Sequence, residues 1–363
     1  MRIASFEVFP VALPFRRPYA TATGTLTRRE MLLVRIGGGD GTPGWGDAVP
    51  LSLRGGPALE AVAADLYACA GVLDGFVLAA DATAAAQEAL SACRRAGAGP
   101  QAISAVDIAL LDLLGKRDGV PAWRLLGASA PERIACNATI GADDAADAAD
   151  AAAKAVRAGF ETIKVKAGDG RDVDRIRSVR AAAGPAPRLR IDANGCWDVA
   201  VALERLHALE AVGLELAEQP GATLADLAAI RSGTEVPVVA DESVTDVAEA
   251  EAAVRLQAID AATLKLAKVG GPRAALAIDS IAPAYLSSAL DSVVGVAAAA
   301  HTAVAMESRG FAAGRAHGLA TSPLFAENVA DDSAFRGPEI DIGSEPGLGV
   351  EPTPGSPMRP ARR

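Results

Sequence analysis

Charged residues close five apolar runs of this sequence at nearly equal intervals. The runs end at Lys166, Asp192, Glu218, Asp241 and Lys265, which are 26, 26, 23 and 24 residues apart. Each interval has room for one strand, one helix and two short loops, and the runs are rich in residues typical of strands. Because the carboxyl ends of parallel barrel strands converge on one mouth, the spacing predicts that these residues surround a single cavity.

The three acids of this set predict a metal site. Asp192, Glu218 and Asp241 would repel one another in one mouth unless a cation held them, and they offer oxygen ligands only. Such a set favours Mg²⁺, with Mn²⁺ as an alternative, and leaves coordination positions for substrate oxygens. The competing interpretation is three unrelated helix-capping or surface acids, which the regular spacing disfavours.

The lysines predict proton transfer at carbon. Lys164 and Lys166 are two residues apart on one strand, so both side chains face the same side. A lysine acts as a base only when neutral, and we expect burial, the neighbouring ammonium and a divalent cation to lower its pKa. Lys265 lies opposite this pair and can deliver a proton or stay charged beside an enolate. Lys268, three residues later, is expected in the loop beyond the strand.

Several other polar residues receive supporting predictions. Asn194 shares a face with Asp192 and is expected near the metal and substrate, whereas Glu242 is expected to support Asp241 from behind. Ser287 and Ser288 end the seventh strand, where a hydroxyl or N–H can hold a substrate carboxylate. Two further groups carry weak signals: the glycine pair 270–271, a candidate anion-binding turn, and the three histidines, for which structural or surface roles are expected, His207, His301 and His317.

The elements that position these residues follow from periodicity. Residues 3–13 and 30–36 read as antiparallel strands, and residues 57–126 read as helices. Strands alternating with helices begin at Arg133 and continue to a seventh strand at 284–288 and an eighth near Leu319, which implies parallel pairing. We therefore expect an α/β protein with three segments: an α+β domain (1–130), a barrel (131–325) and a turn-rich C-terminal segment (326–363) that ends in a disordered tail.

Bulk properties narrow the class of protein. The formal net charge is −10, which argues against nucleic acid or an anionic membrane as a partner. No apolar run reaches the length that spans a bilayer, and an acid at position 7 interrupts any signal-peptide core. Four scattered cysteines without a CxxC pair indicate a reducing compartment. The expected partner is a small carboxylate substrate, the expected location is the cytoplasm, and a homo-oligomer is left open.

The motifs together resemble the enolase superfamily, specifically its muconate-lactonizing-enzyme subgroup. They span nearly the whole chain and comprise residues 107–116, 125–127, 159–166 and 240–243. The resemblance implies a capping domain, formed by the N-terminal part and the returning C-terminal segment, over a modified TIM barrel of the (β/α)7β type. It also implies that Asp192, Glu218 and Asp241 bind Mg²⁺ and that Lys166 removes the proton α to a carboxylate. Lys164 would tune Lys166, and Lys265 would face it.

Two phrases point to one activity within that subgroup. Residues 286–295, with Ser287 and Ser288, and residues 316–321 are similar to o-succinylbenzoate synthases, which dehydrate a succinylated hydroxycyclohexadiene carboxylate in menaquinone synthesis. Residues 318–324 lack the acid pair of dipeptide epimerases, and no histidine ends the seventh strand as in mandelate-racemase-like members. The rivals are an N-acylamino-acid racemase, a muconate cycloisomerase and a non-catalytic carboxylate-binding barrel. By the resemblance, specificity lies in the loop 14–26, which contains Arg16, Arg17, Tyr19 and Thr21.

Overall fold

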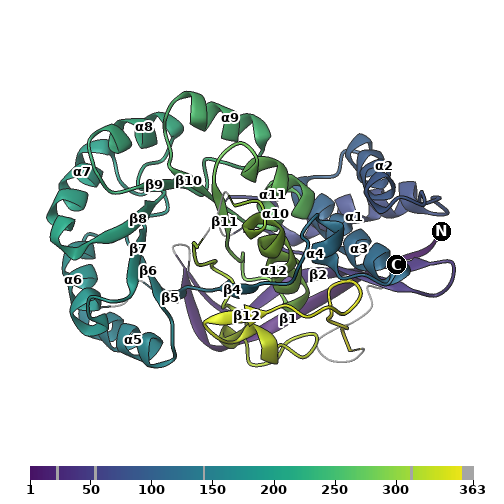
Figure 1. The fold of residues 1–363 in the computed structure, drawn as a ribbon, viewed down its shortest axis with the longest axis horizontal. Helices are drawn as coiled ribbons and strands as arrows, with labels where there is room; N and C mark the ends of the chain where they lie inside the picture. The colour runs from purple at the N-terminus through teal and green to yellow at the C-terminus, as the bar shows by residue number, and fades with distance from the viewer. Residues whose placement is uncertain (22–23, 53–54, 142–143, 311–313, 354–363) are drawn as a thin grey trace.

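The structure consists of a barrel-like arc of parallel strands and a neighbouring part built on an antiparallel sheet (Figure 1). It is a computed structural model, and it describes residues 1–363 except 22–23, 53–54, 142–143, 311–313 and 354–363. The tail that the sequence predicts to be disordered therefore lies outside the described residues. None of the described helices is long and apolar enough to cross a membrane.

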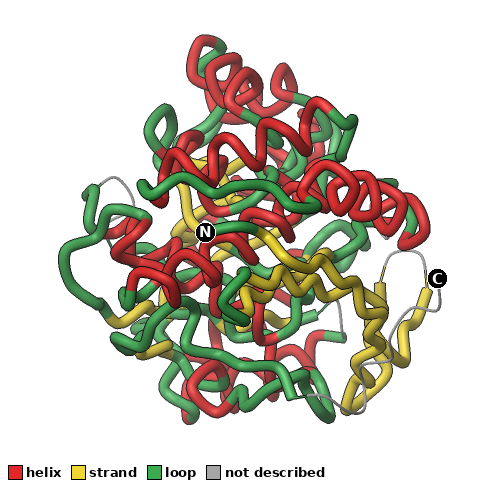
Figure 2. Tube along the Cα trace, turned by 90° about the vertical axis from the view of Figure 1, so that its right-hand side faces the viewer, coloured by secondary structure: helices red, strands yellow, loops and turns green. Residues whose placement is uncertain are grey.

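The N-terminal sheet is antiparallel, with the order β1-β2-β3. Its strands are β1 (Ile3–Thr21), β2 (Gly24–Gly38) and β3 (Pro43–Ala48). Successive side chains of β2 point to opposite faces, so Leu32 and Val34 enter the core of the capping part whereas Met31 and Leu33 enter the core shared with the barrel. Both faces of the sheet are therefore buried, and Figure 2 shows its long strands beside the helices of the same part.

The first two strands run further than the sequence predicts. The segment expected as a loop over the substrate continues the β1–β2 hairpin, with Tyr19 opposite Leu26 and an irregular register between Pro14 and Tyr19. β1 is an edge strand, where proline is tolerated because no partner needs its N–H. Phe15 stacks on Tyr19 and on Phe325, which brings the hairpin against the chain after the barrel. The side chain of Thr21 lies outside the described residues.

Helices cover one face of this sheet. They are α1 (Leu59–Leu73), α2 (Ala82–Arg95), α3 (Pro100–Asp118) and α4 (Ala122–Leu125). All residues from Gln101 to Gly115 of α3 are buried, so this helix is central. It packs closely on β3 because Gly46 has no side chain: a Cβ there would lie 2.0 Å from the Ala105 carbonyl oxygen. The predicted helical region is thus confirmed as a cluster around α3.

Seven parallel strands form the barrel sheet in the order β11-β10-β9-β8-β7-β6-β5. They are β5 (Ala138–Ile140), β6 (Thr162–Lys166), β7 (Arg188–Asp192), β8 (Leu214–Glu218), β9 (Val238–Ala240), β10 (Ala261–Leu264) and β11 (Ala284–Leu286). The predicted parallel alternation is confirmed. In place of the eighth strand, His317 and Gly318 form short bridges to Cys136 and Ser287, which closes the ring between the two edge strands.

Helices follow the barrel strands: the first five lie on the outside of the arc (Figure 1), and the last three pack toward the N-terminal part. They are α5 (Ala145–Arg157), α6 (Asp172–Ala183), α7 (Val199–Ala208), α8 (Leu224–Ser232), α9 (Val247–Arg255), α10 (Leu266–Val269), α11 (Pro272–Asp279) and α12 (Val293–Glu307), with short 3₁₀ turns η2 (Glu210–Val212), η3 (Ser322–Leu324) and η4 (Ser333–Phe335). Five of these helices begin at a side chain that accepts a hydrogen bond from their first turn, namely Asp144, Asp198, Thr223, Asp246 and Ser292.

The C-terminal segment contacts earlier parts of the chain at two places. β12 (Glu339–Asp341) pairs with β4 (Arg133–Ala135), which the sequence analysis had assigned to the first barrel strand. Further on, Leu348 N–H donates to the buried carboxylate of Asp112 at 2.9 Å, and Trp45 N–H donates to the same group at 2.9 Å. The end of the described chain thereby packs on α3 and β3. The boundaries at residues 130 and 325 stay predictions.

A buried polar network joins the sheet to the barrel. Asp47 of β3 accepts hydrogen bonds from Ser292 N–H at 2.8 Å and from its hydroxyl at 2.7 Å, at the start of α12. Arg29 of β2 donates to the Ala289 carbonyl at 3.2 Å, and Asp291 lies in the same buried group. Burial, with the charge of Asp291 adding to it and that of Arg29 opposing it, raises the pKa of Asp47 to about 7.

This network predicts a stability that depends on pH. An unfolded Asp titrates near pH 4, so between about pH 4 and pH 7 the folded chain binds more protons than the unfolded chain and its stability falls as pH rises. The fall from Asp47 is about 4 kcal/mol at most. Asp47→Asn keeps an acceptor for Ser292, and we expect this variant to show a weaker dependence of stability on pH. Urea unfolding at pH 5 and pH 7.5 measures the difference, and equal pH slopes for the two proteins would refute the assignment.

Candidate active site

The five charged residues of the sequence pattern lie at the carboxyl ends of consecutive strands. Lys166, Asp192 and Glu218 are the last residues of β6, β7 and β8, whereas Asp241 and Lys265 directly follow β9 and β10. Lys166 is paired in register with Asp192, which is paired with Glu218. Because side chains two residues apart share a face, Leu216 and Val239 lie one step below Glu218 and Asp241, and they form a buried apolar layer with Ala261 and Tyr285. This layer is the floor of the site.

The two lysines of β6 face the same carboxylates. Lys164 Nζ lies 2.9 Å from Asp192 Oδ2 and 2.6 Å from Glu218 Oε1. Lys166 Nζ lies 2.7 Å from Asp192 Oδ2 and donates to Asn194 Oδ1 at 2.9 Å. The Lys164 side chain is 7% exposed and that of Lys166 is 22% exposed. The predicted common face is confirmed, and Lys166 is the member of the pair that solvent and substrate can reach.

On the opposite side, two lysines hold the third acid. Lys265 pairs with Asp241 Oδ2, and Lys268 Nζ lies 2.9 Å from Asp241 Oδ1. The prediction that Lys268 lies in the loop beyond the strand is wrong, because the residue is helical. Lys268 belongs to the short helix α10, whose turn directs its side chain back to the end of β9. Four of the six lysines in the chain thus meet three carboxylates.

The charges of this cluster set its electrostatics. Burial lowers the pKa of Lys164, but the carboxylates of Asp192 and Glu218 outweigh it, so that the pKa lies well above its ordinary value. Burial raises the pKa of Asp192, but the two β6 ammonium groups outweigh it and leave the pKa below its usual range. Burial and the charge of Asp192 raise the pKa of Glu218. At Lys164 the carboxylate partners therefore outweigh burial. The lowered pKa expected of the catalytic lysine stays a prediction.

The sequence analysis did not identify two candidate functional residues, Tyr285 and Arg190. The Tyr285 hydroxyl donates to Glu218 Oε2 at 2.7 Å, and the Arg190 guanidinium lies 4.7 Å from the centre of the Tyr285 ring. Arg190 in turn bonds Glu215 Oε2 at 2.6 Å. Tyr285 therefore fixes one oxygen of Glu218 while Lys164 fixes the other. The period-two pattern of strands could have identified Arg190, which stands two residues before Asp192, but nothing in the sequence connects Tyr285 to Glu218.

Amide side chains orient the loops around the acids. Asn194 Nδ2 donates to Glu242 Oε1 at 3.0 Å, and Asn194 N–H donates to Asp192 Oδ1 at 3.0 Å. Gln219 Oε1 accepts from Asp241 N–H at 2.8 Å, which links the ends of β8 and β9. Asn194 and Gln219 both have positive φ angles, 47° and 41°, and this backbone conformation turns the chain across the mouth. The predicted place of Asn194 beside Asp192 agrees with these contacts.

The serines after β11 face different partners. The Ser288 hydroxyl donates to Asp291 Oδ2 at 2.6 Å and accepts from Leu290 N–H at 3.1 Å, so it shapes the turn before α12. Ser287 N–H donates to the Leu264 carbonyl at 2.8 Å, beside the end of β10. Substrate binding by either serine stays a prediction, and the Ser287 hydroxyl is the better placed because it is not part of that turn.

The glycine pair after α10 has a structural partner. Asp107 of α3 accepts from Arg273 N–H at 3.1 Å and pairs with the guanidinium of Arg273. Gly271 has a φ of 106°, and a Cβ there would lie 2.7 Å from the Asp107 carboxylate. The anion at this turn is thus Asp107 itself, which corrects the predicted external anion. The capping helix α3 thereby holds the segment that follows Lys265.

Two of the histidines are buried and bond to other parts of the fold. His301 and His317 are buried, and burial lowers the pKa of both, that of His301 to about 4. His317 Nδ1 accepts from Leu286 N–H at 3.0 Å within the barrel closure.

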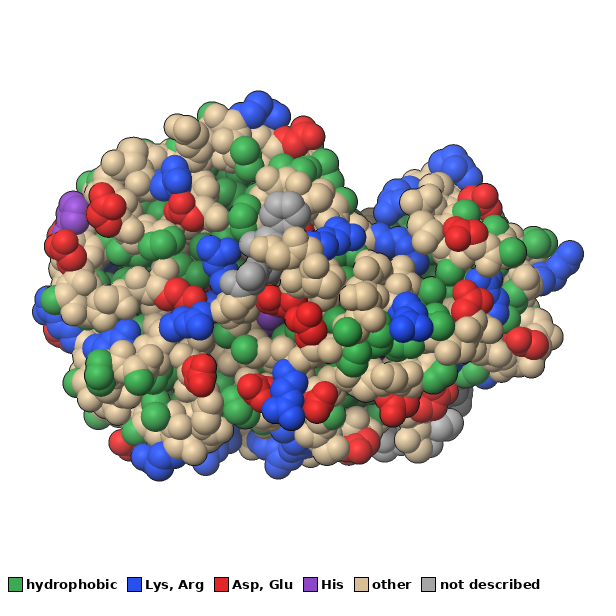
Figure 3. Space-filling view, viewed as in Figure 1, with side chains coloured by type: hydrophobic (Ala, Val, Ile, Leu, Met, Phe, Trp, Pro, Cys, Tyr) green, Lys and Arg blue, Asp and Glu red, His purple; other side chains and the backbone are tan. Residues whose placement is uncertain are grey.

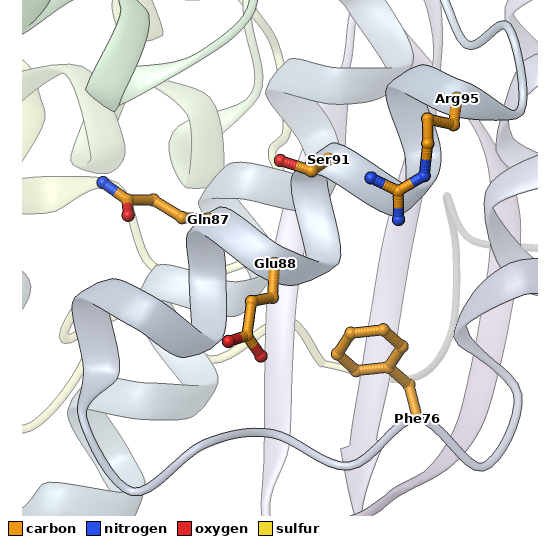
Figure 4. A pocket seen from close by; sticks show the side chains of 5 residues that line it. All are labelled: Phe76, Gln87, Glu88, Ser91 and Arg95. Carbon is orange, nitrogen blue, oxygen red and sulfur yellow. The ribbon is translucent and has the colours of Figure 1, made fainter.

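A surface pocket of about 280 Å³ on the capping side, lined by Phe76, Gln87, Glu88, Ser91 and Arg95, shares no residue with the lysine–carboxylate cluster (Figure 4). On the face shown in Figure 3, acidic and basic side chains are interspersed.

The three acids fit a divalent cation by their chemistry. Across the part of the chain that the structure describes, no three His, Cys, Asp or Glu side chains are gathered closely enough to hold an ion. In the structure an ammonium group lies against each of the three carboxylates. Their charges still act on one another, since Asp241 raises the pKa of both Asp192 and Glu218. Buried oxygen donors at three neighbouring strand ends suit Mg²⁺ or Mn²⁺ once these ammonium groups move away.

Comparison with known proteins agrees with this geometry. Residues 3–127 match the mandelate racemase / muconate lactonizing enzyme N-terminal domain, and residues 147–356 match the enolase C-terminal domain-like family. The D-Ala-D/L-Ala epimerase of Cytophaga hutchinsonii is 31% identical over 84% of each chain. The o-succinylbenzoate synthase of Mycobacterium tuberculosis is 41% identical over 56% of this chain and 62% of that protein.

A solved structure extends the likeness to three dimensions. The dipeptide epimerase from Cytophaga hutchinsonii, complexed with Mg and the dipeptide D-Ala-L-Val, has a TM-score of 0.89 and 28% identity over 98% of this chain and 97% of that one. Matches to both halves and similarity over almost the full length leave one conclusion. The chain belongs to the mandelate racemase / muconate lactonizing enzyme family of the enolase superfamily.

Proposed function

We propose that this enolase-superfamily enzyme dehydrates 2-succinyl-6-hydroxy-2,4-cyclohexadiene-1-carboxylate to o-succinylbenzoate with the help of Mg²⁺. The observation that carries the general chemistry is the placement of lysine ammonium groups on β6 and β10, on opposite sides of the carboxylate cluster. Such a site suits removal of a proton α to a carboxylate. The small carboxylate substrate, the cytoplasmic location and a homo-oligomer stay predictions.

In this proposal the metal is held by Asp192, Glu218 and Asp241. A bound divalent cation would supply positive charge that offsets the negative charge of an enolate. Lys166, as a neutral amine, can accept the α proton as the C–H bond breaks. The electron pair forms a double bond from the α carbon to the carboxylate carbon, and the carboxylate oxygens take up the negative charge. Lys265 stays cationic on the other side, where its charge stabilises the enolate.

The second half of the reaction needs the same lysine. As the electron pair returns and the C–O bond breaks, Lys166 gives its proton to the departing hydroxyl, so that water leaves and the ring becomes aromatic. Removal and return of the proton occur on one face, which requires a single mobile ammonium. Lys166 meets this requirement because it is the more exposed β6 lysine, whereas Lys164 is held by two carboxylates.

The choice of the dehydration rests on two features. Ser287 and Ser288 follow β11, where the resemblance implies a catalytic histidine in mandelate-racemase-like members, and residues 318–324 contain no acid to hold a substrate ammonium. The 41% identity to an o-succinylbenzoate synthase supports the same choice. The second candidate is racemisation or epimerisation of an N-acylated amino acid or dipeptide. It is favoured by the epimerase relative and by lysines on both sides of the site, which can exchange a proton from either face.

One pair of assays tests the proposal. Purified enzyme is mixed with the cyclohexadiene substrate, with and without Mg²⁺, and dehydration is followed by ultraviolet absorbance. The proposal expects fast conversion that depends on the metal. In parallel, N-succinyl amino acids of both configurations and a dipeptide are incubated in D₂O, and α-deuterium is measured by mass spectrometry. Exchange without any dehydration would reject the lyase in favour of the second candidate.

A further inference from the structure

Lys268 stands out because it is buried in the site although the proposed chemistry does not use it. It lies on α10, and its side chain turns back past Lys265 to the end of β9. A lysine ammonium has three N–H donors. Those of Lys268 face three acceptors: the carboxylate Oδ1 of Asp241 at 2.9 Å, the backbone carbonyl of Asp241, and the backbone carbonyl of Thr263 at 3.1 Å.

These contacts hold the backbone as well as the charge. Thr263 belongs to β10 and Asp241 directly follows β9, so one ammonium group ties two neighbouring strand ends together. Lys268 N–H also donates to the Lys265 carbonyl at 2.8 Å, which fixes the turn that carries both lysines. Removal of Lys268 would leave two buried carbonyl oxygens and a carboxylate oxygen without this donor.

The two lysines that contact Asp241 therefore differ in the groups that they bind. Lys265 contacts the carboxylate through Oδ2, and Lys268 holds Oδ1 together with the backbone on both sides. When a cation binds the cluster, one of the two ammonium groups must give way. The proposed mechanism needs Lys265 at the substrate. Lys268 would keep its bonds to the backbone carbonyls of Asp241 and Thr263 if it stayed in place.

We propose that Lys268 is a positioning residue that fixes Asp241 through Oδ1, so that Oδ2 is presented to the metal and Lys265 is released toward the substrate. This inference rests on the metal site of the proposed function but not on the identity of the substrate. Groups that hold a metal-binding carboxylate typically change metal affinity by about 10- to 100-fold when they are removed.

The test measures Mn²⁺ binding rather than turnover. Free Mn²⁺ is titrated by electron paramagnetic resonance in the wild type, Lys268→Met, Lys268→Gln and the control Lys154→Met, which changes an exposed lysine of α5. We expect Lys268→Met to bind Mn²⁺ about 10- to 100-fold more weakly. Lys268→Gln, which can still donate to the carbonyl groups, should recover part of the loss, and Lys154→Met should match the wild type.

Each outcome decides the inference. Unchanged Mn²⁺ affinity in Lys268→Met, with a native circular dichroism spectrum, would overturn it. Tighter binding would also overturn it, because it would show that the ammonium only repels the cation. If Lys268→Met does not fold, Lys268→Gln carries the test, with wild-type affinity as the contradicting result. A wild type that binds no Mn²⁺ would reject the metal site itself, whereas normal Mn²⁺ binding without dehydration would reject only the proposed substrate.

Discussion

Replacing Lys166 with alanine is expected to lower kcat by about 10²- to 10⁴-fold, the usual contribution of a positioned general base. The amine at the end of β6 is the group that accepts and returns the proton, and no other lysine has the same access. The substitution removes a partly exposed side chain whose partner Asp192 keeps Lys164. The variant should therefore fold, bind Mn²⁺ and keep a KM close to that of the wild type.

Steady-state kinetics with the best substrate and circular dichroism provide this measurement. Lys154→Ala, a change of an exposed lysine on α5, is the matched control and should leave kcat unaltered. A loss of less than about tenfold in Lys166→Ala would contradict the role of Lys166 as the base.

Asp192→Asn is expected to have the second large effect, on stability and on metal binding together. The carboxylate of Asp192 is the shared partner of Lys164 and Lys166, and Lys164 is almost fully buried. Breaking a buried ion pair from one side costs about 3–5 kcal/mol, because a buried charge loses its partner; Glu218 still faces Lys164 and should keep the loss near the lower end. The neutral amide is also a poorer ligand for a hard cation.

Urea unfolding without metal and Mn²⁺ titration measure these two effects. The difference between the proteins should shrink at low pH: the folded pKa of Asp192 lies below its ordinary value, so its stabilisation is present above the unfolded pKa and is lost as pH falls. Asp150→Asn, an exposed acid on α5, is the control. Equal stability and Mn²⁺ affinity in Asp192→Asn and wild type would contradict the assigned role.

The barrel and most of its mouth could be predicted from the sequence because both depend on short-range periodicity. Apolar β-branched runs separated by one helix determine parallel strands, and a charge at the end of each run, as at Asp192 or Glu218, is placed by that topology alone. The family and the α/β fold with its capping part are confirmed. The dehydration, the metal ligands and the domain boundaries stay predictions.

What sequence reasoning missed depends on contacts between distant segments. Lys268 enters the site because α10 is a single turn that folds its side chain back, and no periodic pattern signals so short a helix. Tyr285 reaches Glu218 across the barrel from a strand 67 residues later. The hairpin of β1 and β2 exceeded its predicted length because an edge strand accepts prolines that would end an interior strand.

The most direct test of the account is a crystal of this protein grown with Mn²⁺ and measured for anomalous scattering. The account predicts one strong peak among the carboxylates of Asp192, Glu218 and Asp241, with the Lys265 ammonium moved off Asp241 and Lys268 still bonded to it. A structure at saturating Mn²⁺ with no peak at this cluster, and the lysine–carboxylate pairs intact, would contradict the central claim.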